Sequence, residues 1–515
     1  MKSLRSAQRN VRTYFQTGLL ILLSLAPPHA LANTGIAVST TNGVIVGKQV
    51  GSVNQFLGIP YAQQPVGERR WRKPLPPLPW SGQLQAHQFG PACPQDNDNF
   101  SRSKVGKQSE ACLFLNIWVP ANSDRPLPVM VWLHGGAHKI GAGSLPFYDG
   151  TELAKRGVVL ITLNYRLGYL GYFSHPALQN EDESGNFGLQ DEIQALSWIQ
   201  QHIGAFGGDP SKITLFGESA GAVDVMYLMA SPAAKSLFHR AIIQSGGGWG
   251  KPSTREKLQT SIVDNLGEEQ VPPQIDKATL RQLSTETLLK AQSRGKKLGF
   301  GPFLDNDIVP SSPSDVFSDG LQLAIPIIVG SNSWEGNLTR VSPPGFLARS
   351  LIHIPPFRGL YQNRGENSER RVEMLFGDVV FGAPAQWLAR QHARVAPAYL
   401  YYFDYVREAL RNKLPGAGHG AEIPYAFDTL SHLKDSRGKV SEADSRLAST
   451  MADCWAEFAK TGKPDCDFSQ WQPHTTERPS VMAITPSPEQ VDIHPLAESF
   501  EHVEKWFGPG SWLDR

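Results

Sequence analysis

Short apolar segments alternate with helical stretches along much of this 515-residue chain, and this alternation constrains the fold more than any other feature. Most of the apolar segments are rich in β-branched residues, which favours buried strands; they cover residues 129–133, 158–163, 212–216, 241–243 and 325–329. Between them, residues 189–203 place apolar side chains at helical spacing. This alternation predicts an α/β fold, with a large and mostly parallel central sheet flanked by helices.

Three regions depart from the alternation. Residues 34–62 are typical of short antiparallel strands, with Asn42-Gly43 as a hairpin turn signal. Residues 251–320 are polar and poor in strands, whereas residues 340–395 are rich in arginine, proline and helical patterns. We expect these last two regions to be insertions over the carboxyl edge of the sheet. Because the sequence has no internal repeat and no low-complexity linker, we expect residues 33–515 to form one large domain.

Residues 1–32 have the order of a secretory signal peptide. Four basic residues and no acidic residue precede an apolar run at residues 18–26, and Ala30 and Ala32 supply the small residues that a signal peptidase reads. An uncleaved membrane anchor is the alternative, but the run is well short of the ~20 residues that span a bilayer. No later segment is apolar enough to cross a membrane. We therefore expect a soluble, exported protein, either periplasmic or secreted.

The charge balance and the cysteine count exclude several classes of protein. The 49 basic and 48 acidic residues give a net charge of +1, without the basic excess of a nucleic-acid-binding protein. Four cysteines are too few for a disulfide-framework miniprotein, although export makes disulfides possible. Cys93 and Cys112 bracket a mostly polar loop and form a plausible bridge. Cys454 and Cys466 could form a second bridge or remain two buried thiols. No pair has a zinc-binding spacing with nearby histidines, so we expect no metal site.

The candidate chemistry concentrates in the sequence Gly-Glu-Ser-Ala-Gly at residues 217–221, between an expected strand and a helical stretch at residues 223–229. A sharp strand-to-helix turn of this kind needs small residues at both ends and holds its serine in a strained backbone conformation. It would lift the Ser219 hydroxyl above the sheet edge, at the N-terminus of the helix. An ordinary glycine-rich turn is the alternative, but the strand–turn–helix context favours a nucleophilic serine.

A second glycine-rich segment supplies candidates for binding an oxyanion. The sequence His-Gly-Gly-Ala-His at residues 134–138 follows an expected strand, as do the loops whose backbone N–H groups bind the oxyanion in esterases. Gly136, Ala137 and Ala220 are the expected donors. A tight turn after a central strand is the alternative interpretation.

Five motifs follow one another in an order that resembles a known family. They are Ser-Glu-Ala-Cys-Leu-Phe-Leu-Asn-Ile at 109–117, Gly-Asn-Phe-Gly-Leu-Gln-Asp at 185–191, Ala-Phe-Gly-Gly-Asp-Pro at 205–210, Gly-Glu-Ser-Ala-Gly at 217–221 and Phe-His-Arg-Ala-Ile-Ile-Gln-Ser-Gly at 238–246. The chain is similar to the type-B carboxylesterase family, which includes cholinesterases and bacterial para-nitrobenzyl esterases, over essentially its whole mature length. The resemblance implies an α/β-hydrolase fold, hydrolysis of small-molecule carboxylic esters, no cofactor and an active-site gorge.

The resemblance also implies a catalytic triad whose acid is a glutamate. Residues 330–336 match the acid's motif and assign Glu335, and residues 418–425 match the histidine's motif and assign His419. The chain order Ser219, acid, histidine is independently expected of this fold. The histidine would act as general base, and the glutamate would orient it and stabilise the imidazolium. We expect the rate to rise with pH near an ordinary histidine pKa, about 6 to 7.

Further residues are assigned by the resemblance to supporting roles. Ser245 is similar to a serine that the family places near the acid and the histidine. Cys93 and Cys112 match the family's N-terminal disulfide. Arg166 and Asp191 resemble a buried structural ion pair, so we expect no catalytic role for them.

Three residues depart from the family pattern. Ala137 replaces the third glycine of the oxyanion loop, which keeps the N–H group but adds a Cβ atom on the acyl side. His138 stands where the family usually has an aromatic residue, and Asp224 occupies a usual serine position on the helix after the nucleophile. We expect these departures to affect the choice of substrate and not the class of reaction.

The sequence thus predicts an exported serine carboxylesterase that works through an acyl-enzyme. A specialised lipase, feruloyl-type or mycotoxin-type esterase is the main alternative. Arg294, Lys296 and Lys297 could favour an anionic substrate or could form a solvated face. A non-catalytic, cholinesterase-like binding protein is a further alternative, which the presence of all three triad residues disfavours. The sequence contains neither the His-Glu-x-x-His motif nor the P-loop motif.

Overall fold

The central strands are apolar along most of their length, so both of their faces must be buried, as in sheets that helices cover on each side. All five side chains of β7 (Val159–Leu163) are buried, as are six of the seven in β6 (Leu127–Leu133). Fully burying one valine, leucine or isoleucine side chain contributes about 1.5–3 kcal/mol. These strands therefore form the hydrophobic centre around which the other elements pack.

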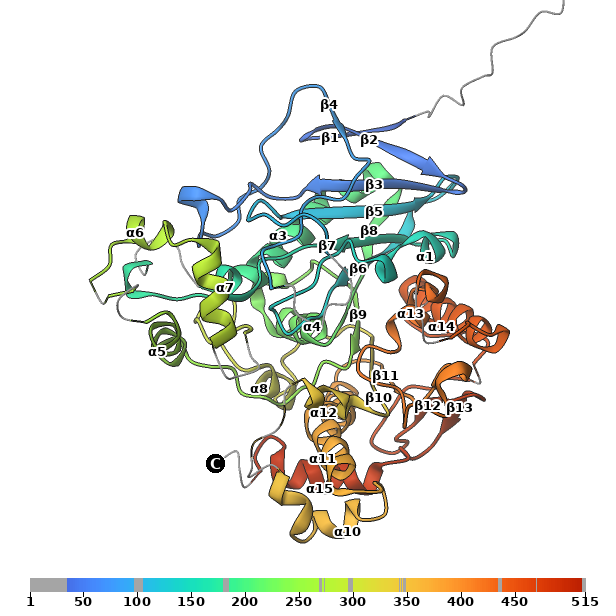
Figure 1. Cartoon of the computed structure of the whole chain (residues 1–515). Helices are drawn as coiled ribbons and strands as arrows, with labels where there is room; N and C mark the ends of the chain where they lie inside the picture. The colour runs from blue at the N-terminus through green and yellow to red at the C-terminus, as the bar shows by residue number, and fades with distance from the viewer. Residues whose placement is uncertain are drawn as a thin grey trace, which may run out of the picture. The chain divides into compact units, whose positions relative to one another are not determined.

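The computed structural model describes residues 35–511, apart from 97–104, 179–184, 268–270, 273, 295–299, 342, 344, 346–348, 434–437 and 469. Within these residues the sheet has 13 strands in the order β1-β2-β3-β5-β7-β6-β8-β9-β10-β11-β12-β13, with β4 paired to β2 (Figure 1). The other strands are β1 (Ile36–Thr40), β2 (Gly43–Val50), β3 (Val53–Pro60), β4 (Gln83–Gln85), β5 (Phe114–Pro120), β8 (Gly208–Glu218), β9 (Arg240–Gln244), β10 (Ile327–Asn332), β11 (Ala398–Phe403), β12 (Val481–Ile484) and β13 (Glu489–Val491).

The strand pairing confirms the predicted sheet. Strands β7, β6, β8, β9, β10, β11 and β12 pair in parallel. Strands β1, β2, β3 and β5 pair in antiparallel fashion, and β5 joins them to the parallel strands through β7. The β1–β2 hairpin turns at Thr41 and Asn42, directly before Gly43, whose φ of +137° suits glycine.

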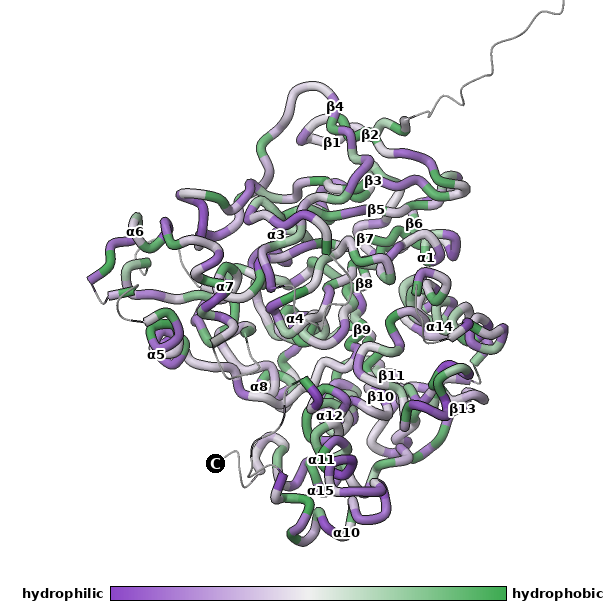
Figure 2. The backbone as a smooth tube through the Cα atoms, in the orientation of Figure 1, coloured by the Kyte–Doolittle hydropathy of each residue, from purple (hydrophilic) through white to green (hydrophobic). Residues whose placement is uncertain are grey.

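Helices cover both faces of the sheet. The helices are α1 (Thr151–Lys155), α2 (Gly168–Gly171), α3 (Phe187–His202), α4 (Ala220–Ala230), α5 (Arg255–Leu266), α6 (Lys277–Arg281), α7 (Thr285–Arg294), α8 (Pro313–Ser318), α10 (Phe357–Tyr361), α11 (Ser368–Gly377), α12 (Ala383–His392), α13 (Ile423–Ala426), α14 (Glu442–Thr461) and α15 (Ala497–Phe507). Helices α3, α4 and α12 contribute to the core on one face, and α1, α13 and α14 contribute to the core on the other. Figure 2 shows hydrophobic segments along the central strands and many hydrophilic residues on the outer helix α14.

The two regions predicted to be insertions are helical, but one of their helices does not lie over the sheet edge. Helix α12 packs against β10 and β11, and its residues Leu388 and Ala389 are fully buried in the core on one face of the sheet. Strands β10 and β11 are parallel neighbours, and parallel neighbours need a crossover connection. Helix α12 provides this crossover, which is why it lies on a face of the sheet.

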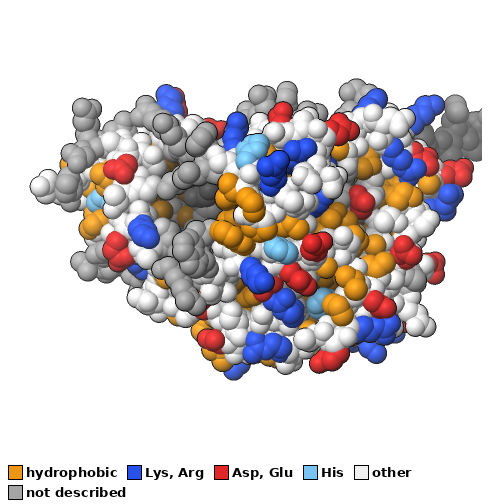
Figure 3. Space-filling model, turned by 90° about the horizontal axis from the view of Figure 1, so that it is seen from below, with side chains coloured by type: hydrophobic (Ala, Val, Ile, Leu, Met, Phe, Trp, Pro, Cys, Tyr) orange, Lys and Arg blue, Asp and Glu red, His pale blue; other side chains and the backbone are white. Residues whose placement is uncertain are grey.

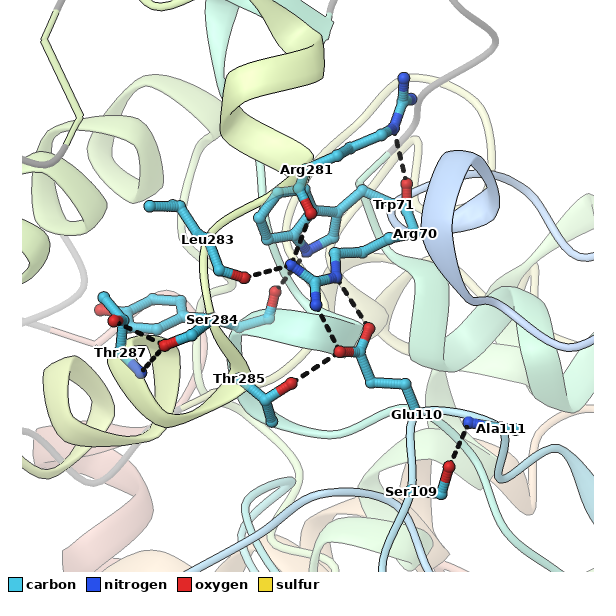
Figure 4. Close-up of polar contacts among 11 residues, drawn as sticks. Arg70, Trp71, Ser109, Glu110, Ala111, Arg281, Leu283, Ser284, Thr285 and Thr287 are labelled. Carbon is cyan, nitrogen blue, oxygen red and sulfur yellow. Dashed lines mark hydrogen bonds and ion pairs between the residues drawn. The ribbon is translucent and has the colours of Figure 1, made fainter.

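Arg70 fastens the first insertion to the N-terminal part of the chain (Figure 4). Its Nε atom donates to Glu110 Oε2 at 2.7 Å, and its Nη1 atom donates to the carbonyl oxygen of Arg281 at 2.7 Å. The Arg281 side chain donates back to the Arg70 carbonyl oxygen at 2.9 Å, and Thr285 donates to Glu110 at 2.6 Å. Helices α6 and α7 are therefore held against the loop that carries Arg70.

Both cysteine pairs form disulfides. Cys93 is bonded to Cys112, as predicted, and Cys454 of α14 is bonded to Cys466. The second pair is therefore a bridge and not the two separate buried thiols that the sequence also allowed. The predicted ion pair between Arg166 and Asp191 is also present, because the guanidinium donates to both oxygens of the buried carboxylate at 2.7 Å.

Several predictions concern residues outside the described part of the chain. Residues 1–32, predicted to be a signal peptide, lie outside it, as do Lys296, Lys297 and the side chain of Arg294. None of the helices in the described ranges combines the length and the apolar character that crossing a bilayer requires. Figure 3 shows hydrophobic side chains interspersed with charged ones on one face of the protein, a mixture that is ordinary for an exposed protein surface.

Candidate active site

The candidate residues follow the carboxyl ends of neighbouring parallel strands. Strand β6 leads into the loop at residues 134–138, and β8 ends directly before Ser219. Strand β10 ends three residues before Glu335, and His419 lies in the loop between β11 and α13. Because parallel strands end at the same edge of a sheet, these residues come together there although they are far apart in the sequence.

Ser219 stands on the sharp strand-to-helix turn that the sequence predicts. Its φ of 54° and ψ of −122° are strained for a residue with a side chain. The turn is possible because its two glycines lack Cβ atoms. A Cβ on Gly221 would lie 2.1 Å from the carbonyl oxygen of Leu133, and one on Gly217 would lie 2.6 Å from the carbonyl carbon of Gly221. The two glycines thus let β8, β6 and the start of α4 approach closely beneath the serine.

Glu335 is fixed by contacts to each of its carboxylate oxygens. Its Oε1 atom accepts from Ser245 Oγ at 2.5 Å and from the backbone N–H of Asn332 at 2.7 Å. Its Oε2 atom lies 2.6 Å from His419 Nδ1. A carboxylate beside Nδ1 keeps the proton on that nitrogen and leaves Nε2 available as a base. The predicted acid, the predicted histidine and Ser245 therefore form one connected group.

Other contacts hold His419 in place. Its backbone N–H donates to Asn337 Oδ1 at 2.9 Å, which ties its loop to the short helix that begins at Glu335. The ring of Phe381 packs against the imidazole, with 4.7 Å between the ring centroids. Phe381 belongs to a π-helical turn (Asp378–Gly382) between α11 and α12, and such turns are frequent at functional sites.

His419 Nε2 faces a glutamate that the sequence analysis did not single out. Ser219 and His419 are both described, and no hydrogen bond joins the serine Oγ to Nε2 in this structure. Instead, Nε2 lies 3.1 Å from Glu218 Oε1. Catalytic hydrogen bonds are often long before substrate binds, so this geometry is compatible with a later contact between the serine and the histidine.

The buried glutamates shift the pKa values of this group. Burial raises the pKa of Glu218 to about 8; His419 opposes this rise, and the charges of Glu422 and Glu335 add to it. Burial by itself would lower the pKa of His419. The neighbouring carboxylates of Glu218, Glu335 and Glu422 outweigh burial and raise the pKa of His419 to about 9. The histidine thus holds its proton more tightly than the sequence analysis assumed.

This pKa predicts how the rate changes with pH. Only neutral His419 can accept a proton, so the rising limb of kcat/KM should lie above the range of an ordinary histidine. Replacing Glu218 with glutamine removes a charge that favours the imidazolium, and the limb should move to lower pH. The measurement is kcat/KM for para-nitrophenyl acetate from about pH 5 to 10. Glu408→Gln, which neutralises an exposed carboxylate, serves as the control. Equal limb positions in wild type and Glu218→Gln would contradict the prediction.

Glu422 and its partners were also missed by the sequence analysis. Glu422 is fully buried, and its carboxylate accepts from Gln244 Nε2 at 3.1 Å and from the side chain of Asn332. The Asn332 side chain also donates to the carbonyl oxygen of Gly418 at 2.9 Å. The sequence did contain a signal for both glutamates. Glu218 lies within the serine motif and Glu422 within the histidine motif, and a charged side chain between buried neighbours cannot reach water.

Of the segments that carry the three expected oxyanion donors, Ala220 directly follows Ser219, and the loop after β6 approaches the serine at Gly135, where an added Cβ would lie 3.0 Å from Ser219 Cβ. Among the described residues, no hydrogen bond uses the N–H of Gly136 or of Ala137. Ala220 is the first residue of α4, where helix N–H groups have no intrahelical partner. Gly136 has a φ of +116° and Ala137 a φ of +55°, so the loop turns sharply after β6. The arrangement can offer three backbone N–H groups to a developing negative charge.

The described residues contain no group of three or more His, Cys, Asp or Glu side chains that could hold a metal ion. A strained serine, a histidine oriented by a carboxylate and backbone N–H donors are the groups that acyl transfer requires.

Comparisons with known proteins identify the family of this chain. The Carboxylesterase family matches residues 34–345 and 358–503. The para-nitrobenzyl esterase of Bacillus subtilis (strain 168) is 36% identical over 471 residues, which cover 87% of this chain and 94% of that protein. The fumonisin B1 esterase of Sphingopyxis macrogoltabida is 34% identical over 470 residues, covering 86% and 85%. The liver carboxylesterase of Sus scrofa is 33% identical over 515 residues, covering 87% and 89%.

Solved structures give the same result for the fold. A PNB esterase matches with a TM-score of 0.78 and 32% identity, covering 91% of this chain and 100% of that chain. A thermophilic PNB esterase matches with a TM-score of 0.79 and 33% identity over the same shares. With its large mixed sheet and its strand-to-helix serine turn, this chain has the α/β-hydrolase fold, belongs to the carboxylesterase family and is a carboxylic ester hydrolase.

Proposed function

We propose that this protein hydrolyses small-molecule carboxylic esters through a Ser219–His419–Glu335 triad and an acyl-enzyme intermediate. The observation that carries the proposal is the 2.6 Å contact between Glu335 Oε2 and His419 Nδ1, at the sheet edge where Ser219 occupies the strained turn. Membership in the carboxylesterase family supports the same chemistry.

The first half of the reaction forms the acyl-enzyme. Ser219 Oγ attacks the ester carbonyl carbon and gives its proton to His419 Nε2. The carbonyl oxygen becomes an oxyanion, which the N–H groups of Gly136, Ala137 and Ala220 stabilise. When the tetrahedral intermediate collapses, the bond to the alcohol oxygen breaks, and the histidine returns the proton to the leaving alcohol.

The second half releases the acid. Water attacks the acyl carbon, His419 Nε2 takes the water proton, and the bond to Ser219 Oγ breaks as the serine regains a proton. The carboxylate of Glu335 stabilises each imidazolium. Before the first attack, Nε2 must leave the 3.1 Å contact with Glu218 and approach the serine hydroxyl.

The likeness to a fumonisin B1 esterase supports a second candidate substrate, a mycotoxin ester. The two candidates differ in the ester that is cleaved and share the triad and the acyl-enzyme.

We also propose that residues 1–32 direct export and are removed, and that residues 33–515 form a single domain. Two disulfides are compatible with an oxidising compartment. Mass spectrometry of the protein from its native host, with a mature N-terminus at residue 33 as the expected result, tests the cleavage site.

A fluorophosphonate tests the nucleophile directly. We expect activity to fall to background after one equivalent has reacted, because Ser219 Oγ forms a bond to phosphorus and fluoride leaves. Peptide mass spectrometry should place the phosphonyl group on the peptide that contains Ser219. A label on a different residue, or full activity after complete labelling of Ser219, would refute the proposed nucleophile. An unlabelled protein without activity on any ester would favour a binding protein.

A further inference from the structure

The two family departures His138 and Asp224 contact each other in the folded protein. His138 Nε2 lies 2.9 Å from each of the two carboxylate oxygens of Asp224. The two side chains are 5% and 0% exposed. They come from segments 86 residues apart, one in the loop after β6 and the other in α4. Such a buried pair is costly unless both groups are fully hydrogen-bonded.

The second ring nitrogen of His138 also faces an acceptor. His138 Nδ1 lies 2.8 Å from the carbonyl oxygen of Phe300, at the end of the first insertion. A neutral imidazole can donate from only one of its nitrogens, whereas a backbone carbonyl and an ionised carboxylate can only accept. With Asp224 ionised, only an imidazolium satisfies both contacts, and the contact with Asp224 is then an ion pair.

Groups on the neighbouring elements are compatible with these charges. Burial and then the charge of Asp224 raise the pKa of Glu192 in α3 well above its ordinary value. The rings of Tyr165 and Tyr172 lie 6.4 and 5.0 Å from the His138 ring, and burial followed by the charge of Asp224 raises both of their pKa values.

The histidines in this loop have different pKa values. Burial lowers the pKa of His134, the backbone of Gly135 opposes this and the charge of His138 adds to it, and together they bring the pKa to about 4. For His138, burial acts to lower the pKa, but Asp224 and the backbone carbonyls of Phe300 and Ala220 raise it above the ordinary value. The pKa values of the two histidines are therefore shifted in opposite directions, and the one that is raised faces the Asp224 carboxyl group.

The pair joins the two segments that supply the oxyanion donors. His138 directly follows Ala137, and Asp224 lies one helical turn after Ala220. Ala137 and His138 both have a φ of 55°, a left-handed conformation that side chains other than glycine adopt at a cost. Because this loop has alanine in place of the third glycine, its conformation needs support from outside the loop.

We propose that the His138–Asp224 ion pair positions the oxyanion hole by holding the loop at residues 136–138 against α4. The pair keeps the N–H groups of Gly136 and Ala137 aimed at the same point as that of Ala220. His138 and Asp224 are positioning residues, since both are buried and act through their backbone neighbours. The inference rests on the proposed function, because it assumes that these three N–H groups bind the oxyanion.

Asp224→Asn tests this role, because it removes the charge and keeps the size of the side chain. Oxyanion donors bind most strongly in the transition state, so we expect kcat for para-nitrophenyl acetate to fall about 10- to 100-fold with little change in KM. The affinity for an alkyl trifluoromethyl ketone should fall in parallel, since Ser219 adds to its carbonyl carbon and leaves an oxyanion in the same place. A role in stability alone would lower Tm without this parallel loss.

Two further variants complete the test. His138→Phe with Asp224→Ser restores the residue types usual in the family and removes both charges together, and it should recover much of the kcat that Asp224→Asn loses. Asp444→Asn is the matched control: Asp444 is also fully buried and accepts from Tyr405 Oη at 2.7 Å, in α14. It should lower Tm and leave both kcat and ketone affinity unchanged.

The outcomes separate this inference from the proposed function. Unchanged kcat and ketone affinity in Asp224→Asn would overturn it. If Asp224→Asn does not fold, the double variant His138→Phe with Asp224→Ser decides. A low kcat in the double variant would overturn the inference, because the residue types usual in the family would then fail to take over the role of the pair. Failure of the proposed function would be seen in the wild type, as a protein that neither hydrolyses esters nor reacts with fluorophosphonate at Ser219.

Discussion

Replacing Ser219 with alanine should lower kcat for para-nitrophenyl acetate by about 10⁴-fold or more, with KM changed far less. Alanine fits the strained turn no worse than serine, since it adds no atom beyond Cβ to the contacts beneath it. The change therefore removes the nucleophilic oxygen and leaves the fold and the oxyanion donors in place. What activity remains should come from the oxyanion donors and from substrate binding.

The measurement needs a control that deletes a hydroxyl elsewhere. Ser197 is suitable, because its Oγ atom donates to the carbonyl oxygen of Ile193 one turn earlier in α3, away from the strand ends. Ser197→Ala should keep the wild-type kcat. The proposed mechanism would be wrong if Ser219→Ala, purified free of wild-type enzyme, retained more than about one tenth of the wild-type kcat.

Replacing Glu335 with glutamine should lower kcat by about 10³- to 10⁴-fold, because the structure fixes how the new amide must point. The Oε1 position faces two donors, Ser245 Oγ and the N–H of Asn332, so the amide oxygen should occupy it. The amide NH₂ group then faces His419 Nδ1, and two N–H groups cannot face each other. The histidine must accept there and carry its proton on Nε2, where it can no longer take the serine proton.

The pH dependence distinguishes this explanation from a simple loss of charge. If Glu335 served only to raise the pKa of His419, the glutamine variant would recover at pH values where the histidine is neutral. A wrong tautomer is itself neutral, so the loss should persist at every pH of a kcat profile. Glu335→Asp keeps a carboxylate and should retain more activity than Glu335→Gln. Full recovery of the glutamine variant at any pH would contradict the tautomer argument.

Local patterns in the sequence were sufficient to predict the fold. Runs such as residues 129–133 and 158–163 are apolar on both faces, and only strands covered on both sides can bury them. The candidate serine and acid each lie in a short motif after an expected strand, and the acid and the histidine could be named because their motifs resemble those of the family. Parallel strands end at one edge, so the topology by itself predicts that these three residues meet.

Tertiary structure decided the contacts between distant segments. The sequence named His138 and Asp224 as departures without an explanation, and only the folded chain brings the histidine of one loop to the carboxylate of α4. The same is true of Glu218, which raises the pKa of His419, and of Cys466, which is bonded to α14. Each of these contacts depends on the packing of side chains from separate elements.

The sequence by itself therefore determined the α/β class, because hydrophobic periodicity acts over a few neighbouring residues, and its motifs supplied the resemblance to the family and with it the candidate catalytic residues. The tertiary structure decided which carboxyl groups lie beside His419 and which one contacts His138. The physical reason is that pKa values depend on burial and on charges within a few ångströms, and these are set only when segments far apart in the sequence pack together.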